Sequence, residues 1–142
     1  MSTPATYYLR FVACLSAFRV CVYILNLEMV TKVKIAKKDW EDPRVRDIAF
    51  MWTKQIRTFM TMRTLIFGAG SYLRNREERN ILAAVSFSFD VYMMFVIYSL
   101  YWAKPVTRPH SVLVHENPLI PSFIQSLHIL AFLVAFYSEH KN

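Results

Sequence analysis

The longest apolar run in the chain, residues 81–103, contains a single charged residue, Asp90. A run of about 20 apolar residues is long enough to cross the roughly 30 Å hydrocarbon core of a bilayer as a helix. Helices buried inside soluble proteins are rarely so uniformly apolar. We therefore expect an integral membrane protein.

Three further apolar stretches resemble this run, at residues 7–27, 48–73 and 118–138. The 142 residues are 55% hydrophobic and contain only two glycines, which favours one compact helical unit without flexible linkers. We predict an all-α fold, a four-helix transmembrane bundle that forms a single domain over residues 1–142. Four spans leave no room for a soluble catalytic domain, so we do not expect an enzyme. We also expect the first stretch to be retained as an anchor, because no small-residue cleavage pattern follows it.

Basic residues gather on one face of this predicted bundle. With four spans, the first and third loops share a face, and the lysines and arginines in and beside these loops are Lys32, Lys34, Lys37, Lys38, Arg44, Arg46, Lys54, Lys104 and Arg108. By the positive-inside rule, this face looks toward the cytoplasm or the mitochondrial matrix. A basic membrane face is typical of contact with anionic head groups such as cardiolipin or with an acidic partner, and elements that read nucleic acid are missing. We expect Lys54, Arg57 and Lys104 to bind lipid head groups.

Four ionisable residues fall near the centres of the four predicted spans: Arg19, Arg63, Asp90 and His128. An ionisable side chain at the bilayer centre costs at least about 2.5 to 3.5 kcal/mol and is normally paired or turned toward protein. One aspartate cannot neutralise two arginines. We predict that Asp90 pairs with Arg19 or Arg63, and that the remaining arginine contacts a lipid phosphate or a carboxylate of a neighbouring subunit. A proton relay is the less favoured alternative, because a relay usually needs several carboxylates and histidines.

Small and polar residues form two predicted packing seams. On a helix through residues 48–73, one face carries Arg57, Thr61, Thr64, Gly68 and Ser71. On the first helix, Ala13, Ala17 and Cys21 form a stripe of small residues. Cys14 and Cys21 lie about 10.5 Å apart along a helix axis, too far for a disulfide, and we predict free thiols in a core.

The sequence gives no clear metal or cofactor site. His128 could be a haem or metal ligand, but bis-histidine ligation needs a second histidine within the membrane. His110 and His115 lie close together without the cysteines or acids of a metal set. We predict no cofactor other than bound phospholipid, with cardiolipin as the candidate.

One motif resembles the ergosterol biosynthetic protein 28 family, whose members are small four-span proteins of the endoplasmic reticulum. In that family, Arg-Thr-Phe opens the second helix and is followed by Gly and then Trp-Thr. Arg57, Thr58 and Phe59 match the first part, whereas Met60 replaces the Gly, and Met62 with Arg63 replaces the Trp-Thr. By topology the resemblance extends over residues 8–138. It implies a non-catalytic tether that gathers enzymes of sterol synthesis.

Three functions are compatible with these features. The small size, the packing seams and the unbalanced cation favour an accessory subunit of a multi-subunit membrane complex, in particular an ATP synthase or respiratory complex of the mitochondrial inner membrane. Its partners would be other membrane subunits and lipids, not nucleic acid. The alternative is the sterol scaffold of the endoplasmic reticulum. A small transporter or lipid-handling enzyme is the weakest of the three, because no broken helix is visible.

Overall fold

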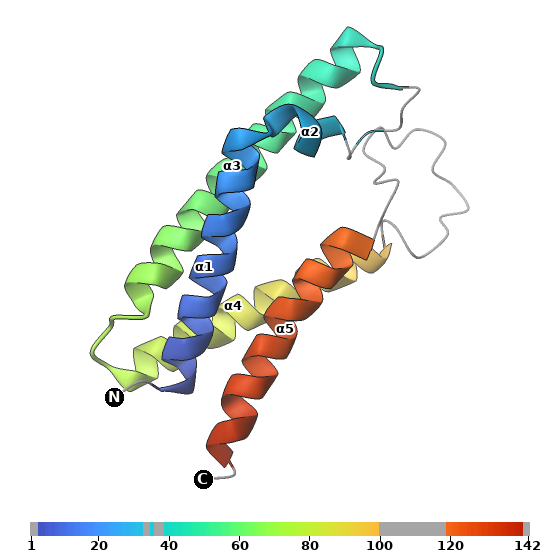
Figure 1. Cartoon of the computed structure of the whole chain (residues 1–142). Coiled ribbons are helices and arrows are strands. Elements are labelled where there is room, and N and C mark those ends of the chain that lie inside the picture. The colour runs from blue at the N-terminus through green and yellow to red at the C-terminus, as the bar shows by residue number, and fades with distance from the viewer. Residues whose placement is uncertain (1–2, 33–34, 36–38, 100–118, 141–142) are drawn as a thin grey trace.

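A computed structural model describes residues 3–32, 35, 39–99 and 119–140 of the chain. The helices found there are α1 (Pro4–Leu25), α2 (Leu27–Lys32), α3 (Pro43–Gly70), α4 (Arg76–Ile97) and α5 (Leu119–His140) (Figure 1). These described residues contain no strand. The predicted all-α fold is therefore confirmed for this part of the chain.

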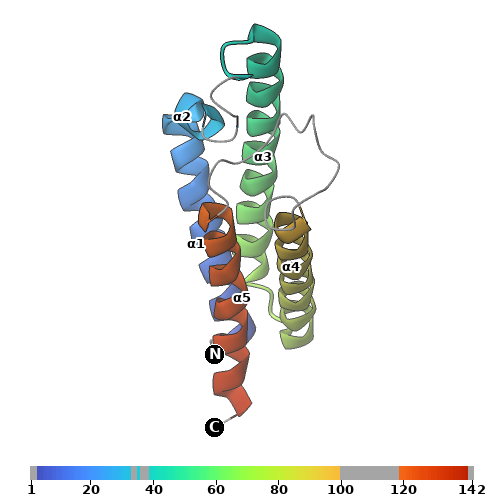
Figure 2. The same cartoon turned by 90° about the vertical axis from the view of Figure 1, so that its right-hand side faces the viewer.

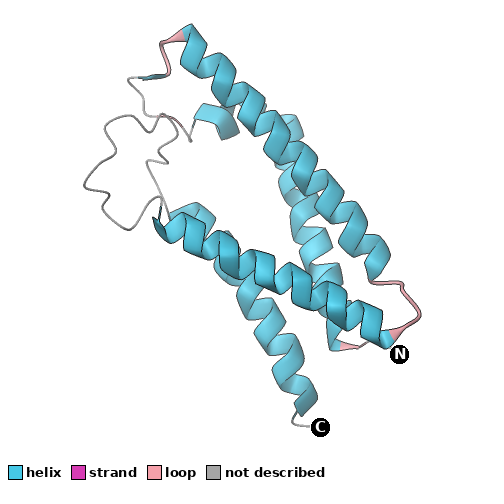
Figure 3. Ribbon diagram, turned by 180° about the vertical axis from the view of Figure 1, so that it is seen from behind, coloured by secondary structure: helices cyan, strands magenta, loops and turns pink. Residues whose placement is uncertain are grey.

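The four long helices run alternately up and down, so that the two chain ends lie at the same end of the bundle (Figure 2). The most extensive helix contact joins α1 to the antiparallel α3, and α5 packs against both α1 and α4. By contrast, the backbones of α3 and α4 approach each other at few points, because the two helices diverge from the turn that connects them (Figures 1 and 3).

Side-chain caps explain where three of the long helices begin. The side chains of Thr3, Asp42 and Asn75 each accept a hydrogen bond from a backbone N–H in the first turn of α1, α3 and α4 respectively. Such caps satisfy backbone donors that have no partner within the helix. In α3 the cap is followed by Pro43, whose fixed φ suits the first helical position.

The prediction of four helices is wrong in number, because α2 is an additional short helix. It follows a bend at Asn26, which ends α1 with its N–H bonded to the carbonyl of Val22 at 3.0 Å. Val30 of α2 is buried and packs with Tyr23 and Met60, so the short helix folds back onto the α1–α3 pair.

Three of the helices are long and apolar enough to cross a membrane: Pro4–Leu25, Arg76–Ile97 and the Leu119–Ser138 part of α5. They indicate a membrane location. The predicted span at 48–73 does not reach the same hydropathy, since α3 carries Lys54, Arg57 and Arg63. Its helix also ends at Gly70, earlier than predicted. At 28 residues α3 is about 42 Å long, and its first turns extend beyond α4 and α5 (Figure 2).

The bounds of α4 differ from the predicted span at 81–103. The helix begins at Arg76, five residues before the predicted span, with Glu77 and Glu78 at the positive end of the helix dipole. It ends at Ile97. The predicted residues Lys104, His110 and His115 lie outside the described part of the chain.

The exterior of the bundle is apolar and its interior is rich in polar groups. Phe18, Phe95 and Phe123 have relative exposures of 66%, 67% and 65%, whereas Asp90 and His128 are fully buried. An apolar exterior suits contact with lipid tails. Cys14 and Cys21 are free thiols with exposed side chains, so their predicted place in a core is wrong.

If α3 crosses the membrane with the other three long helices, both termini lie on one side. Tags at the two ends and an insertion in the turn at residues 71–75 should then share the same protease access in sealed vesicles, because this turn lies at the same end of the bundle as both termini. An insertion at residues 39–42 should show the opposite access. Opposite access of the two termini would contradict a bundle with four spans.

Candidate functional site

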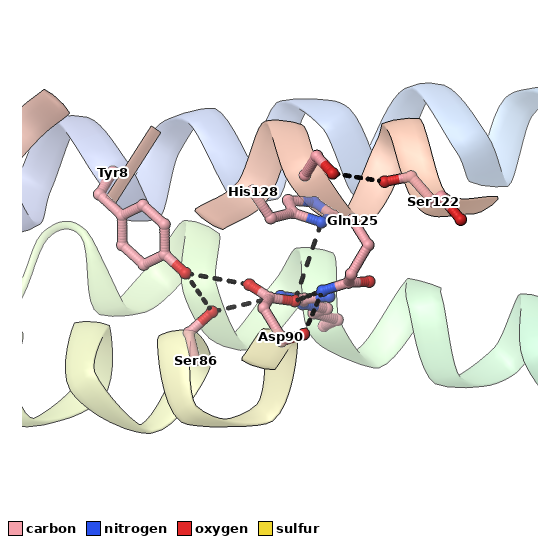
Figure 4. A network of polar contacts seen from close by, with 8 residues as sticks. Tyr8, Ser86, Asp90, Ser122, Gln125 and His128 are labelled. Carbon is pink, nitrogen blue, oxygen red and sulfur yellow. Dashed lines mark hydrogen bonds and ion pairs between the residues drawn. The ribbon is translucent and has the colours of Figure 1, made fainter. Parts of the chain in front are cut away.

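The centre of the bundle contains Asp90, a fully buried aspartate on α4 that is contacted from three other helices (Figure 4). From α3, Arg63 Nη2 donates to Asp90 Oδ1 at 2.6 Å. From α5, Gln125 Nε2 donates to the same oxygen at 2.7 Å. From α1, the hydroxyl of Tyr8 lies 3.1 Å from Oδ2. One carboxylate therefore joins all four long helices.

Ser86 extends this network by one helical turn. Ser86 and Asp90 are four residues apart on α4 and so share a face. Ser86 Oγ lies 3.1 Å from the hydroxyl of Tyr8 and 3.3 Å from Arg63 Nη2. Because Tyr8 has one hydroxyl proton, it can donate to Ser86 or to Asp90 but not to both at once.

The guanidinium of Arg63 is as well enclosed as the carboxylate that it meets. Only 7% of the side chain is exposed. Its central carbon lies 5.4 Å from the ring centre of Phe67 and 5.5 Å from that of Phe89, within the range of cation–π attraction. Removing two charges from water is costly, and the pair is stable only if its remaining donors and acceptors are satisfied. For Asp90, the hydroxyl of Tyr8 and the amide of Gln125 supply the additional hydrogen-bond donors.

The structure thus pairs Asp90 with Arg63 rather than with Arg19. Arg19 is partly buried and, within the described residues, forms no ion pair with a carboxylate. It lies in the half of α1 that leads to α2, about 9 Å from the end of the helix at 1.5 Å per residue. Two arginines and one aspartate therefore leave an excess positive charge in the bundle.

His128 is also fully buried, but its contacts are weaker. Its Nδ1 lies 3.8 Å from Asp90 Oδ1, which is too long for a hydrogen bond. Neither ring nitrogen has a hydrogen-bond partner among the described residues. His128 thus adds a buried imidazole beside the ion pair without completing the coordination of the carboxylate.

The sequence analysis did not identify Tyr8, Ser86 or Gln125 as members of this site. Their side chains are neutral, so they do not stand out in an apolar helix as a charge does. A helical spacing could have found two of them, because Ser86 precedes Asp90 by four residues and Gln125 precedes His128 by three.

The predicted seam on α3 is only partly buried between helices. A methyl group added at Gly68 would lie 3.8 Å from Cβ of Ala13, in ordinary contact with α1. Ser71 is buried and Thr64 is partly buried. Thr61 is exposed, which contradicts its predicted place in the seam; its hydroxyl bonds to the carbonyl of Arg57 at 2.9 Å on its own helix.

A cavity of about 410 Å³ lies beside the ion pair, among the long helices. Its lining is mostly apolar, with polar side chains from each of α1, α3 and α5. The complete lining is Arg19, Tyr23, Ile56, Phe59, Met60, Arg63, Phe89, Met93, Val96, Ile97, Pro121, Ile124 and Gln125. In the part of the chain that the structure describes, no group of three or more His, Cys, Asp or Glu is placed to hold a metal ion.

No protein-family model, curated protein or solved structure matches the chain. The resemblance to the ergosterol biosynthetic protein 28 family therefore stays a prediction. Arg57, Thr58 and Phe59, which carry it, lie on consecutive positions in the middle of α3.

Loss of the buried carboxylate should destabilise the bundle strongly. In Asp90→Ala, Arg63 remains buried without its counter-ion, and we expect a loss of about 3 to 5 kcal/mol in the free energy of unfolding. The double change Asp90→Ala with Arg63→Leu should recover part of this loss. Denaturant unfolding in lipid or detergent measures both, with the exposed Asp47→Ala as a control. A double variant no more stable than Asp90→Ala would contradict the pairing.

Gln125 and His128 provide a matched comparison on one helix. Gln125→Leu removes the donor to Asp90 and should cost about 1 to 3 kcal/mol, because the buried acceptor loses a partner. His128→Leu removes two ring nitrogens that have no hydrogen-bond partner, so the free energy of unfolding of this variant should be unchanged or higher. Thermal unfolding of the two variants in the same lipid decides between them. Greater destabilisation by His128→Leu would show that the imidazole has a structural partner.

Proposed function

We propose that this chain is a non-catalytic accessory subunit of a large multi-subunit membrane complex. The observation that carries this proposal is the carboxylate of Asp90, whose contacts join four helices in the interior. A carboxylate bonded in this way stabilises one helix arrangement. It is poorly suited to proton transfer, because Asp90 is fully buried and its carboxylate oxygens already accept hydrogen bonds from the neighbouring helices.

The exterior of the bundle offers surface for neighbouring subunits. Only 11% of the most apolar part of α5 is fully buried in the bundle, so much of this helix is open to its surroundings. The outward side chains include Phe123, Leu130 and Val134. An apolar helix face of this kind packs equally well against lipid or against a helix of another subunit.

The fourth span forms part of the same proposal. α3 is the helix that packs most extensively on α1, and it contributes Arg63 to the interior. A helix with polar residues crosses a membrane more readily when neighbouring helices cover them. We place α3 across the bilayer with its first turns projecting on the basic face, where Lys54 and Arg57 meet anionic head groups such as those of cardiolipin.

The proposed location is the mitochondrial inner membrane, with an ATP synthase or a respiratory complex as the parent assembly. The alternative is the scaffold for sterol-synthesis enzymes in the endoplasmic reticulum, supported by the Arg57-Thr58-Phe59 motif. The two proposals differ in the partners that they require, so one experiment separates them.

Native electrophoresis of gently solubilised membranes, with mass spectrometry of the comigrating proteins, tests the proposed function. We expect the chain to migrate with the subunits of one large respiratory or ATP-synthase complex. Comigration with sterol-synthesis enzymes would support the alternative. Migration as a free small protein in mild detergents would contradict both.

The contact with head groups is tested by reversing one charge on each face. Lys54→Glu should reduce binding to cardiolipin-containing vesicles, because each basic residue near an anionic surface contributes about 1 kcal/mol. Arg74→Glu, an equally exposed change near the other end of the bundle, serves as the control and should reduce it less. Flotation with vesicles of phosphatidylcholine and cardiolipin measures the difference. Equal losses in the two variants would contradict a specific basic face.

A further inference from the structure

The cavity beside the ion pair has the size and the lining of a small-molecule site. Its volume of about 410 Å³ lies within the range of about 300 to 1,000 Å³ that is typical of ligand pockets. Most of the wall is aromatic, aliphatic or methionine, with Phe59, Met60, Phe89 and Met93 among its members. Such a lining accepts an acyl chain.

The polar groups at this cavity are positively charged in excess. Arg19 and Arg63 both line it, and the one carboxylate of the cluster, Asp90, is already bonded to Arg63. A protonated His128 would only increase the imbalance. An unbalanced cation in a medium of low polarity is expensive, and one additional negative charge would neutralise it.

A second observation concerns the guanidinium that the ion pair and the cavity share. Arg63 is more than nine-tenths buried and lines the cavity, and its Nε has no hydrogen-bond partner among the described residues. Buried polar atoms in native structures nearly always have a partner. A negative charge in the cavity would therefore stabilise Arg63 through space as well as pair with Arg19.

We propose that this cavity binds an amphiphile with a single negative charge, whose head group pairs with Arg19 and whose acyl chain lies against Phe59, Met60, Phe89 and Met93. A long-chain carboxylate and a phospholipid with a monoanionic phosphate share this chemistry. Arg19 lies in the half of α1 that leads to α2, whereas Tyr8, which contacts Asp90, lies in the other half, so a head group at Arg19 is displaced from the ion pair toward the α2 end of the bundle. The proposal concerns the isolated chain and does not depend on its being part of a complex.

Native mass spectrometry of the full chain released from maltoside micelles tests this site directly. The probes are palmitate, hexadecanol as its uncharged counterpart, and dioleoyl phosphatidylglycerol. We expect the chain to retain one molecule of palmitate or phosphatidylglycerol and to bind hexadecanol at least about tenfold more weakly, because a charge-assisted hydrogen bond is lost. The preferred anionic probe identifies the source of the head group.

Four variants assign the binding to this cavity. Arg19→Leu should weaken binding about tenfold or more, and Arg19→Lys should retain most of it. Val96→Phe fills the cavity while leaving both arginines in place, and it should also weaken binding. Arg10→Leu, on the same helix but outside the cavity, should have no effect. Loss in both Arg19→Leu and Val96→Phe supports the site even if one of them is less stable.

The proposal is overturned if the chain retains neither anionic probe, if hexadecanol binds as well as palmitate, or if Arg19→Leu binds like the unchanged chain. These outcomes leave the comigration experiment unaffected, because that experiment does not measure lipid binding.

Discussion

The arrangement of the helices depends on one desolvated carboxylate. Asp90 is fully buried on α4, and an aspartate in such a place is tolerated only when donors surround it. Arg63, Gln125 and Tyr8 supply those donors from α3, α5 and α1. Each of these helices must therefore present one particular face to α4, because a rotation would withdraw its donor. In a bilayer, where lipid tails compete with apolar packing, such polar contacts give helix pairing its specificity.

This arrangement also explains why α3 differs from the other long helices. Its polar residues exclude it from the three helices that qualify as spans by composition alone, yet it forms the largest helix contact, with α1. Gly68, near the end of α3, lies against Ala13 at the middle of α1, and Arg63 joins α3 to α4 through Asp90. α3 also diverges from α4 (Figure 1), and side chains of both helices line the cavity to which Arg19 contributes.

The sequence predicted the helical class and the ionisable residues of the site, because long apolar runs and buried charges are strong signals. The positions of the charges along their helices left both Arg19 and Arg63 as possible partners for Asp90. Which arginine pairs with it depends on how each helix is rotated about its axis. Tyr8 gave no signal, since a neutral polar residue does not stand out in a membrane helix, whereas the spacing of Gln125 from His128 on one helix could have revealed it. Thr61 was placed in the seam by helical spacing alone, but burial along α3 depends on where α1 packs against it, and Thr61 is exposed. α2 depends on a tertiary contact of Val30 that no local pattern reveals.

The most direct test of this account is a measurement of the contact between Arg63 and Asp90 in a lipid bilayer. Solid-state NMR on the chain labelled with ¹⁵N-arginine and ¹³C-aspartate reports the dipolar coupling between guanidinium nitrogens and carboxyl carbons. The 2.6 Å contact between Nη2 and Oδ1 predicts a strong coupling that disappears in Asp90→Asn and in Arg63→Lys but persists in Arg19→Lys. A coupling that is absent from the unchanged chain, or that is lost only in Arg19→Lys, would contradict the pairing on which the helix arrangement rests.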